Sequence, residues 1–196
     1  MYTFDHNLFL WLNFDGGALL DRLMVWASTP VMWAWLYGLI FWLVWRRGSW
    51  KGLALFILAL AIALVGADMV AGIFKHTGLL KGLLPHFPAR LRPMHTPELE
   101  GLVHTVKQGG LYGTVSAHAA TNVALAIITS RFVARRWMSW LMVVVTIVIC
   151  YSRIYLGYHF PMDIALGAVT GAVCALVALG VVRMVEIQNS KFKIQN

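Results

Sequence analysis

Apolar residues fall in five long runs along the chain, separated by short polar segments. The runs extend from about Thr29 to Trp45, Gly52 to Phe74, His118 to just before Arg131, Trp137 to Tyr155 and Met162 to Val185. A helix needs about 17–25 largely apolar residues to cross a bilayer. The third run is short, so we expect its helix to be tilted or packed within the bundle. The pattern predicts an all-α integral membrane protein with about five transmembrane helices.

The first 28 residues follow a different pattern. Polar side chains interrupt this segment at Asp5, Asn13, Asp15, Asp21 and Arg22, and Gly16-Gly17 breaks it. Its apolar residues keep helical spacing on one face, which is typical of an amphipathic helix in the membrane interface. We therefore expect an interfacial N-terminal helix over residues 1–28, with a sixth span as the alternative.

The polar segments also predict the domain organisation. Residues 1–187 are expected to form a single membrane domain, followed by a polar, frayed C-terminal tail at residues 188–196. The longest connection, residues 75–117, carries Pro85, Pro88, Pro93 and Pro97, so we expect an extracytoplasmic loop of irregular backbone. The start of the chain lacks a basic region, an apolar core and a small-residue cleavage site in succession, so no cleaved signal peptide is expected.

Composition supports a membrane protein, and the distribution of charge predicts its orientation in the bilayer. Sixty per cent of the 196 residues are apolar and 12% are charged, whereas a soluble domain carries about 25% charged residues. The net charge of +8 arises largely between or after the apolar runs, at residues 46–51, 131–136 and 183–193. If five spans alternate, these clusters share one side, which the positive-inside rule makes cytoplasmic. We therefore expect a multi-pass protein of the cytoplasmic (inner) membrane with a cytoplasmic C-terminus.

Two classes of site are disfavoured by the same reading. Basic residues do not alternate with solvent-facing aromatics, which argues against nucleic acid as a partner. Cys150 and Cys174 fall inside apolar runs, where small buried side chains are expected, and no closely spaced cysteine pair suggests zinc. All seven histidines instead fall at the outer ends of the spans or in the loops there.

The segment from Ser152 to Asp163 joins the outer ends of the last two spans and carries several chemically active side chains. Pro161 suits the first turn of the following helix, so His159 falls at the helix N-terminus and Asp163 one turn further on. A carboxylate in this position can accept the imidazole N–H, set its tautomer and raise its nucleophilicity. The guanidinium of Arg153 suits phosphate, and the helix N-terminus favours an anion.

A second group precedes the third span. Ser116 offers a hydroxyl and backbone N–H groups near a helix start, and His118 is a second imidazole, which suits a nucleophile paired with a general acid. Lys75 and Arg92 add cations at the same face. These residues meet the needs of phosphoryl transfer. Because no carboxylate cluster suited to Mg²⁺ is visible, neither a metal nor another cofactor is expected.

In these residues the chain resembles the type 2 phosphatidic acid phosphatase family, relatives of the vanadium haloperoxidases. The third family motif (Ser-Arg, five residues, His, three residues, Asp) matches without a gap from Ser152 to Asp163. The second motif, Pro-Ser-Gly-His, matches as Val115-Ser116-Ala117-His118, with Val for Pro and Ala for Gly. The resemblance covers most of the chain, from the second span to the fifth.

The first family motif (Lys, six residues, Arg-Pro) departs from the pattern. It matches at Arg92-Pro93, but Lys75 precedes the arginine by a longer stretch than the family pattern allows. We interpret residues 77–88 as an insertion that shapes the head-group entrance or merely lengthens the loop. Lys81 is the less favoured candidate for the motif lysine.

The resemblance implies a haloperoxidase-like phosphatase core and a two-step mechanism. In the family, the histidine corresponding to His159 attacks phosphorus and becomes a phosphohistidine, oriented by the residue corresponding to Asp163. His118 would protonate the leaving oxygen and then activate water. The residues implied to hold the phosphoryl oxygens are Lys75, Arg92, Arg153 and Ser116.

The expected substrate is an amphiphilic lipid phosphate at the outer face of the membrane, and the membrane itself is the other expected partner. Undecaprenyl diphosphate, cleaved to the monophosphate, is the first choice, because the small size of the chain and the near absence of extra domains suit such a bacterial enzyme. The run from Gly109 to Gly113 resembles members described as undecaprenyl diphosphatases or lipid A phosphatases. Lipid A, phosphatidylglycerol phosphate and phosphatidic acid are alternatives. The rival classes are a lipid or ion transporter, a vanadate-holding haloperoxidase and an inactive relative. No oligomeric state is indicated.

Two further features of the spans bear on packing and function. Asp68 lies inside the second span, and an intramembrane carboxylate is a functional candidate by default. We weigh a polar contact supporting the active site evenly against a structural role. Gly167 and Gly171 form a small-xxx-small pattern in the fifth span, which predicts close helix packing within one chain or between copies.

Overall fold

The computed structural model describes the backbone of residues 2–195 and the side chains of residues 4–188. Over this range the chain forms helices α1 (Tyr2–Leu12), α2 (Gly17–Ala27), α3 (Ala34–Phe74), α4 (Ala117–Val133), α5 (Arg136–Tyr155) and α6 (Pro161–Gln195), with short 3-10 turns at Pro30–Trp33, Pro93–His95 and Pro97–Leu99. The described chain contains no strand, only an isolated bridge between Leu91 and Tyr112. The predicted all-α class is confirmed.

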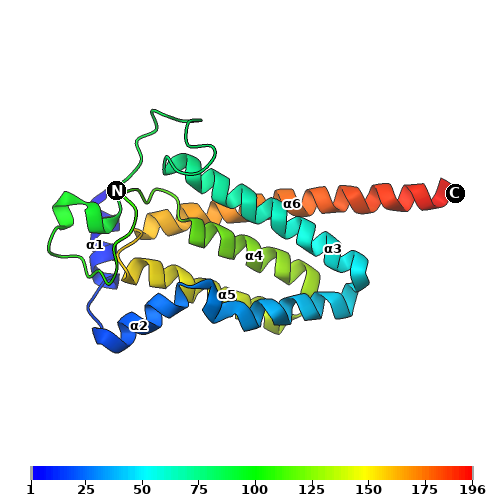
Figure 1. Cartoon of the computed structure of the whole chain (residues 1–196), viewed down its shortest axis with the longest axis horizontal. Helices are drawn as coiled ribbons and strands as arrows, with labels where there is room; N and C mark the ends of the chain where they lie inside the picture. The colour runs from blue at the N-terminus through cyan, green and yellow to red at the C-terminus, as the bar shows by residue number, and fades with distance from the viewer. Residues whose placement is uncertain (1, 196) are drawn as a thin grey trace.

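Helix α3 is a hairpin of two arms. Its backbone reverses at Ser49, where φ is 57° and ψ is −169°, so the first arm runs away from α2 and the second returns alongside it (Figure 1). Phe41 and Phe56 face each other across the arms with ring centroids 5.5 Å apart, whereas fifteen residues of straight helix would separate them by about 22 Å. The predicted connection between the first two spans, at residues 46–51, is therefore this turn.

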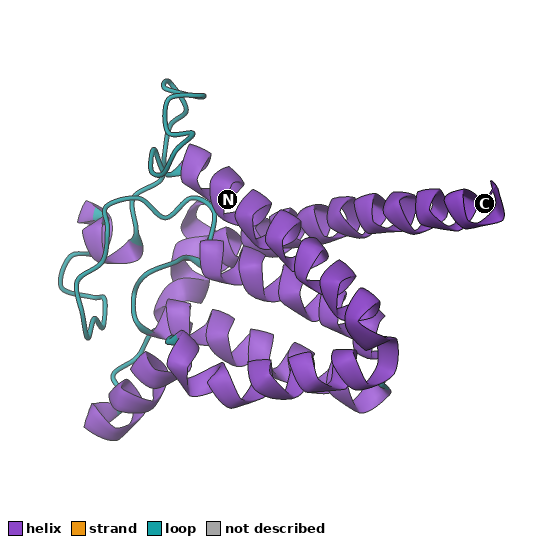
Figure 2. Ribbon diagram, turned by 45° about the vertical axis from the view of Figure 1, so that its right-hand side comes forward, coloured by secondary structure: helices purple, strands orange, loops and turns teal. Residues whose placement is uncertain are grey.

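Helix α4 lies at the centre of the bundle and packs against α3, α5 and α6. The segments Pro30–Phe74, Arg136–Tyr155 and Pro161–Gln188 are long and apolar enough to cross a membrane. The first of these segments contains the two arms of α3, and the 17-residue α4 follows it. The two arms together with α4, α5 and α6 make the five helices that the sequence predicted. The long loop gathers at one end, and the end of α6 projects from the other (Figure 2).

Small side chains allow these helices to approach closely. The second arm of α3 presents a buried stripe at every fourth residue, made of Ala59, Ala63, Ala67 and Ala71. On α6, a Cβ added to Gly171 would lie 2.1 Å from the carbonyl oxygen of Ala120 on α4, and one added to Gly167 would lie 2.5 Å from that of Ser116. The close packing predicted from the glycine pattern is confirmed, within one chain.

The two ends of the chain differ from the sequence expectations. The N-terminal segment forms two helices, α1 and α2, with a break at residues 13–16 near the glycine pair. Asn13 holds this break on the bundle, because its side-chain amide donates to the carbonyl oxygens of His104, Ile154 and Tyr155. At the other end, α6 remains helical to Gln195. The frayed tail predicted from residue 188 is thus wrong over the described backbone, since no glycine or proline ends the helix there.

Candidate active site

The predicted site residues come from five parts of the chain that meet at the loop end of the bundle. Lys75 is the C-cap of α3 and Ser116 the N-cap of α4. The others follow in order: Arg92 in the long loop, His118 in the first turn of α4, Arg153 in the last turn of α5, His159 before α6 and Asp163 in its first turn. Helix ends thus supply most of the site, which places polar groups where the apolar spans stop.

His159 and Asp163 form the buried centre of the site. Each is 1% exposed, and His159 Nδ1 lies 3.6 Å from Asp163 Oδ2, an ion-pair distance too long for a hydrogen bond. The same carboxylate oxygen accepts the backbone N–H of Phe160 at 3.0 Å. This contact, one half of a capping box, holds the carboxylate in the first turn of α6, facing the imidazole.

The electrostatic environment keeps the imidazole of His159 neutral. Burial lowers its pKa well below the usual value of 6.5, and the charges of Lys75, Arg153 and Arg92 lower it further. A neutral imidazole retains the lone pair that a nucleophile needs. The pKa of Lys75 is also lowered, from 10.5 to about 8, mainly by burial and next by the charge of Arg92.

The two site arginines are held by named contacts. Arg92 Nε donates to the carbonyl oxygen of Tyr112 at 3.0 Å, and Arg153 donates to the hydroxyl of Ser28 at the end of α2. The ring of Tyr158 lies beside both guanidinium groups, at 4.2 Å from Arg153 Cζ and 5.5 Å from Arg92 Cζ. Cation–π contacts of this kind orient a guanidinium while leaving N–H groups for an anion.

Two glycines make room for this crowding. A Cβ at Gly113 would lie 3.1 Å from Asp163 Oδ2 and 3.5 Å from His159 Nδ1. At Gly109 it would lie 2.6 Å from a terminal nitrogen of Arg92. The backbone of the glycine run before Ser116 therefore passes directly over the site, which gives a steric reason for its composition.

Ser116 and His118 open α4 next to this centre. Ser116 is fully buried; its backbone N–H donates to the carbonyl oxygen of Asp163 at 3.0 Å, and its hydroxyl accepts the N–H of Ala119 at 3.4 Å as a helix cap. His118 lines a largely apolar cavity of about 490 Å³ between α4 and the arms of α3. Asp68 lines the same cavity and is exposed.

The structure brings all seven predicted side chains to one end of the bundle, and it separates the two lysine candidates. Lys75 is 9% exposed, and the charges of Arg92, Asp163 and Arg153 act on it. Lys81 is exposed in the loop. Geometry therefore favours Lys75 for the role of the displaced motif lysine.

Asp5 and Arg90 are functional candidates that the sequence did not single out as a pair. Arg90 Nη1 lies 2.5 Å from Asp5 Oδ2 and 3.8 Å from Asp163 Oδ1, and its guanidinium stacks 3.6 Å from the ring of Phe160. The other oxygen of Asp5 accepts the backbone N–H of Met162 in the first turn of α6. No local pattern could have found this contact, because Asp5 and Arg90 are 85 residues apart.

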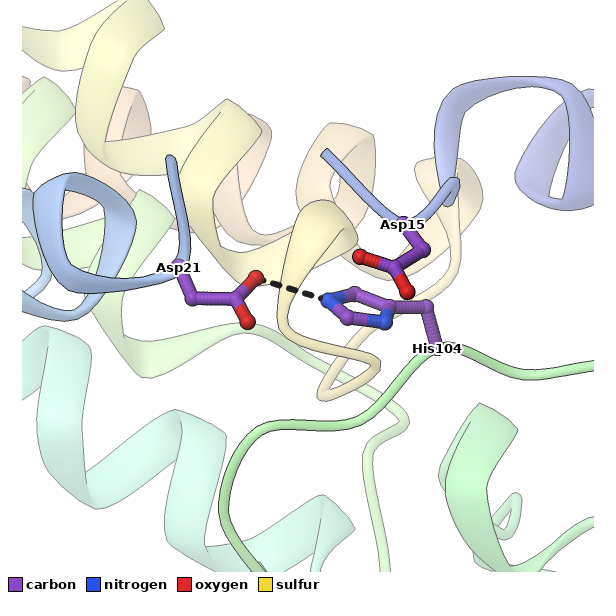
Figure 3. Close-up of side chains that lie close together, drawn as sticks. All are labelled: Asp15, Asp21 and His104. Carbon is purple, nitrogen blue, oxygen red and sulfur yellow. Dashed lines mark hydrogen bonds and ion pairs between the residues drawn. The ribbon is translucent and has the colours of Figure 1, made fainter. Parts of the chain in front are cut away.

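A second polar cluster lies beside the N-terminal break. Among the described residues, the side chains of Asp15, Asp21 and His104 have ligand atoms within 4.8 Å of one another (Figure 3). Their hydrogen-bonding groups are engaged: Asp21 Oδ1 accepts from Tyr155 at 2.7 Å and pairs with His104 Nε2 at 2.8 Å, and Asp15 Oδ1 accepts the N–H of Gly17. The cluster ties α2 to the long loop.

Comparison with known proteins identifies the family. Residues 69–186 match the model of the PAP2 superfamily. The chain is 32% identical over 174 residues to a lipid A 4'-phosphatase of Porphyromonas gingivalis, covering 86% of this chain and 69% of that protein. It is 26% identical over 172 residues to an undecaprenyl-diphosphatase of Sulfolobus acidocaldarius, covering 86% and 74%.

The fold is also similar to that of a solved structure. The crystal structure of Aquifex aeolicus LpxE superposes with a TM-score of 0.63 over 89% of this chain and 93% of that one, at 21% identity. The resemblance found in the three motifs is thereby confirmed by the family match and by the fold. The chain belongs to the PAP2 superfamily and is a multi-pass membrane phosphatase of that family.

Proposed function

We propose that this protein removes phosphate from a membrane lipid through a phosphohistidine formed on His159. One observation carries the proposal: the buried imidazole of His159 lies 3.6 Å from the Asp163 carboxylate, and three cations at the same end of the bundle lower its pKa. Cations around a nucleophile bind a phosphate group and stabilise the charge that spreads over its oxygens in the transition state. Lys75, Arg92 and Arg153 take this role.

The reaction proceeds in two displacements. His159 attacks phosphorus through Nε2, the nitrogen opposite the one that faces Asp163; an N–P bond forms as the bond from phosphorus to the leaving oxygen breaks. His118 gives its proton to that oxygen, and the bound phosphate dianion favours the protonated form of this second imidazole. In the second step His118 takes a proton from water, whose oxygen attacks phosphorus and releases inorganic phosphate with neutral His159.

The apolar cavity next to His118 supports a lipid substrate. Its walls include Tyr37, Ile40, Phe56 and Leu60 from both arms of α3. The leaving group would occupy this side of the site, since His118 is the residue assigned to protonate it. An acyl or prenyl chain is the kind of leaving-group substituent that apolar walls at this depth accommodate.

Between the lipids considered, the relatives favour lipid A over the undecaprenyl diphosphate expected from the sequence. The lipid A 4'-phosphatase shares 32% identity with this chain and the undecaprenyl-diphosphatase 26%. We therefore propose a lipid A phosphate as the first substrate to test and undecaprenyl diphosphate as the second. A site on the extracytoplasmic face of the inner membrane, opposite the basic residues, suits both.

Two measurements test the proposal. Purified protein is mixed with a ³²P-labelled lipid and quenched in alkali, which preserves phosphohistidine; label on His159 is expected, and label elsewhere would contradict the assigned nucleophile. A panel of lipid A, undecaprenyl diphosphate, phosphatidylglycerol phosphate and phosphatidic acid, assayed with EDTA, then ranks the substrates. Fastest release from lipid A supports the assignment, equal rates on all four lipids contradict it, and failure with every lipid would favour an inactive or transporting relative.

A further inference from the structure

A large basic cavity lies at the end of the bundle opposite the candidate active site. Its volume is about 870 Å³, and it lies between the turn of α3, the end of α4 and the middle of α6. Arg47, Lys51, Arg131 and Arg183 line it, with Glu186 as the one carboxylate among its lining residues. The proposed phosphatase reaction uses none of these side chains.

The charge of this cavity is unbalanced within the described chain. Four cations and one carboxylate leave a net charge of +3 (four minus one) along one concave wall. Arg47 donates one N–H to the carbonyl oxygen of Val133 at the end of α4. Among the described side chains, Lys51, Arg131 and Arg183 form no ion pair with a carboxylate. Like charges gathered in a concavity raise the local potential and favour an anion there.

The position of the cavity along α6 places it at a membrane surface. Arg183 follows Asp163 by 20 residues of helix, which corresponds to about 30 Å, the thickness of the hydrocarbon core. Trp45 and Trp50 flank the turn of α3 with rings 6.0 Å apart, both exposed, and exposed tryptophans are typical of the interface. The cavity therefore opens where phospholipid head groups lie, on the side that the positive-inside rule makes cytoplasmic.

The remaining walls indicate that the anion belongs to a lipid. Val44, Leu55, Phe132 and Leu179 continue the cavity toward the apolar part of the bundle. A free anion would need only the basic side chains of the cavity. A phospholipid also places its glycerol and acyl carbons against apolar walls below its phosphate. Basic pockets between helices on the cytoplasmic side are suited to anionic head groups.

We propose that this cavity binds the phosphate of an anionic phospholipid of the cytoplasmic leaflet. Arg47, Arg131 and Arg183 hold the phosphate oxygens from α3, α4 and α6, and so join three helices through one ligand. A ligand that binds only the folded state raises the apparent stability, by an amount that grows with the logarithm of its concentration relative to its Kd. The bound lipid therefore stabilises the bundle from the face opposite the catalytic residues.

The test compares two triple variants of the full chain. The first, Arg47→Gln/Arg131→Gln/Arg183→Gln, removes three charges from the cavity. The matched control, Arg46→Gln/Arg135→Gln/Arg136→Gln, removes three charges from the same face outside the cavity lining. Each protein is purified in neutral micelles with phosphatidylcholine, and its melting temperature and lipid-bound mass spectrum are recorded as phosphatidylglycerol is added.

We expect phosphatidylglycerol to raise the melting temperature of the wild type and of the control, and to remain bound to both in the mass spectrometer. The cavity variant should lose this shift, with an affinity lower by tenfold or more, since each charge-assisted bond contributes about a factor of ten. An Arg→Lys triple at the same three positions keeps the charge and should retain most of the shift. If the glutamine triple does not fold in phosphatidylcholine alone, the Arg→Lys triple takes its place in the comparison with the wild type.

Three results would overturn the proposal. If phosphatidylglycerol does not stabilise the wild type, the cavity is not a lipid site. If both glutamine triples lose the shift equally, the effect comes from the overall charge of this face. If inorganic phosphate in phosphatidylcholine micelles stabilises the wild type as much as phosphatidylglycerol does, the site binds a soluble anion and not a lipid.

Discussion

The buried ammonium group of Lys75 leads to a specific pH dependence. Burial and the neighbouring charge of Arg92 lower its pKa from 10.5 to about 8, so the group is charged below pH 8 and becomes neutral above it. If the charged form binds the phosphate, kcat/KM should be constant near pH 7 and fall at alkaline pH. At pH 9, one unit above the pKa, about a tenth of the enzyme keeps the proton, so kcat/KM should be about tenfold lower.

The assay distinguishes the free enzyme from the substrate complex. The profile of kcat/KM reports groups in the free enzyme, and that of kcat reports groups in the complex. A bound phosphate dianion stabilises the protonated form of Lys75. The alkaline decline should therefore appear near pH 8 in kcat/KM and at higher pH in kcat. Initial rates of phosphate release between pH 6.5 and 10, at low and saturating lipid, give both profiles.

Two matched variants identify the group. Lys75→Arg keeps the charge throughout this pH range, so its kcat/KM should be lower than that of the wild type but should not decline near pH 8. Lys81→Arg changes an exposed lysine of the same loop and should leave the decline in place. A wild-type profile that is flat to pH 10, or a Lys75→Arg profile with the same decline, would refute the reasoning.

Two further predictions rest on side-chain and backbone contacts, and a third rests on the distribution of charge along the chain. Asp5→Asn removes the charge that pairs with the arginine beside the Asp163 carboxylate. A charge-assisted hydrogen bond contributes about 1.5–3 kcal/mol, so kcat should fall by about 10–100-fold with KM unchanged, whereas Asp21→Asn, which weakens another tether of the N-terminal segment, should change kcat much less. Equal losses in the two variants would mean that only the tethering matters. Gly171→Ala brings a methyl group to 2.1 Å from the carbonyl oxygen of Ala120, so the free energy of unfolding should drop by about 1–3 kcal/mol, measured as a lower melting temperature; an unchanged value would contradict the close packing of α4 and α6. A reporter enzyme that works only in the cytoplasm should be active when fused after Asn196. Activity of a periplasm-specific reporter at the same position would contradict the predicted orientation.

The sequence was most informative where short-range physics decides the structure. Apolar runs are long enough for helices to be placed without tertiary information. Near His159, a proline at the first turn and a carboxylate one turn on defined both the start of α6 and the dyad. Small residues four apart on one helix predicted close helix packing, because glycine lets two helix backbones approach; the structure identifies α4 as the partner of α6.

What the sequence did not provide depends on contacts between distant segments. Asp5 reaches α6 and the long loop, and Asn13 binds backbone carbonyls more than 90 residues away; no periodicity encodes such pairs. The connection at residues 46–51 was predicted, but its form as a helix reversal at Ser49 was not, since the basic residues there are equally compatible with a turn and a longer loop. Tyr158 was passed over because an aromatic residue beside a motif histidine carries no signal until two arginines are seen against its ring.

The central claim is that His159 is the nucleophile of a lipid phosphatase, and phosphate release by His159→Ala tests it most directly. Wild type, His159→Ala and His86→Ala, which replaces an exposed loop histidine, are assayed in detergent with EDTA and the lipid that the wild type hydrolyses fastest. We expect release by the wild type and by His86→Ala, and loss of activity to background in His159→Ala. Substantial release by His159→Ala would contradict the mechanism, because no phosphohistidine could then form at that position.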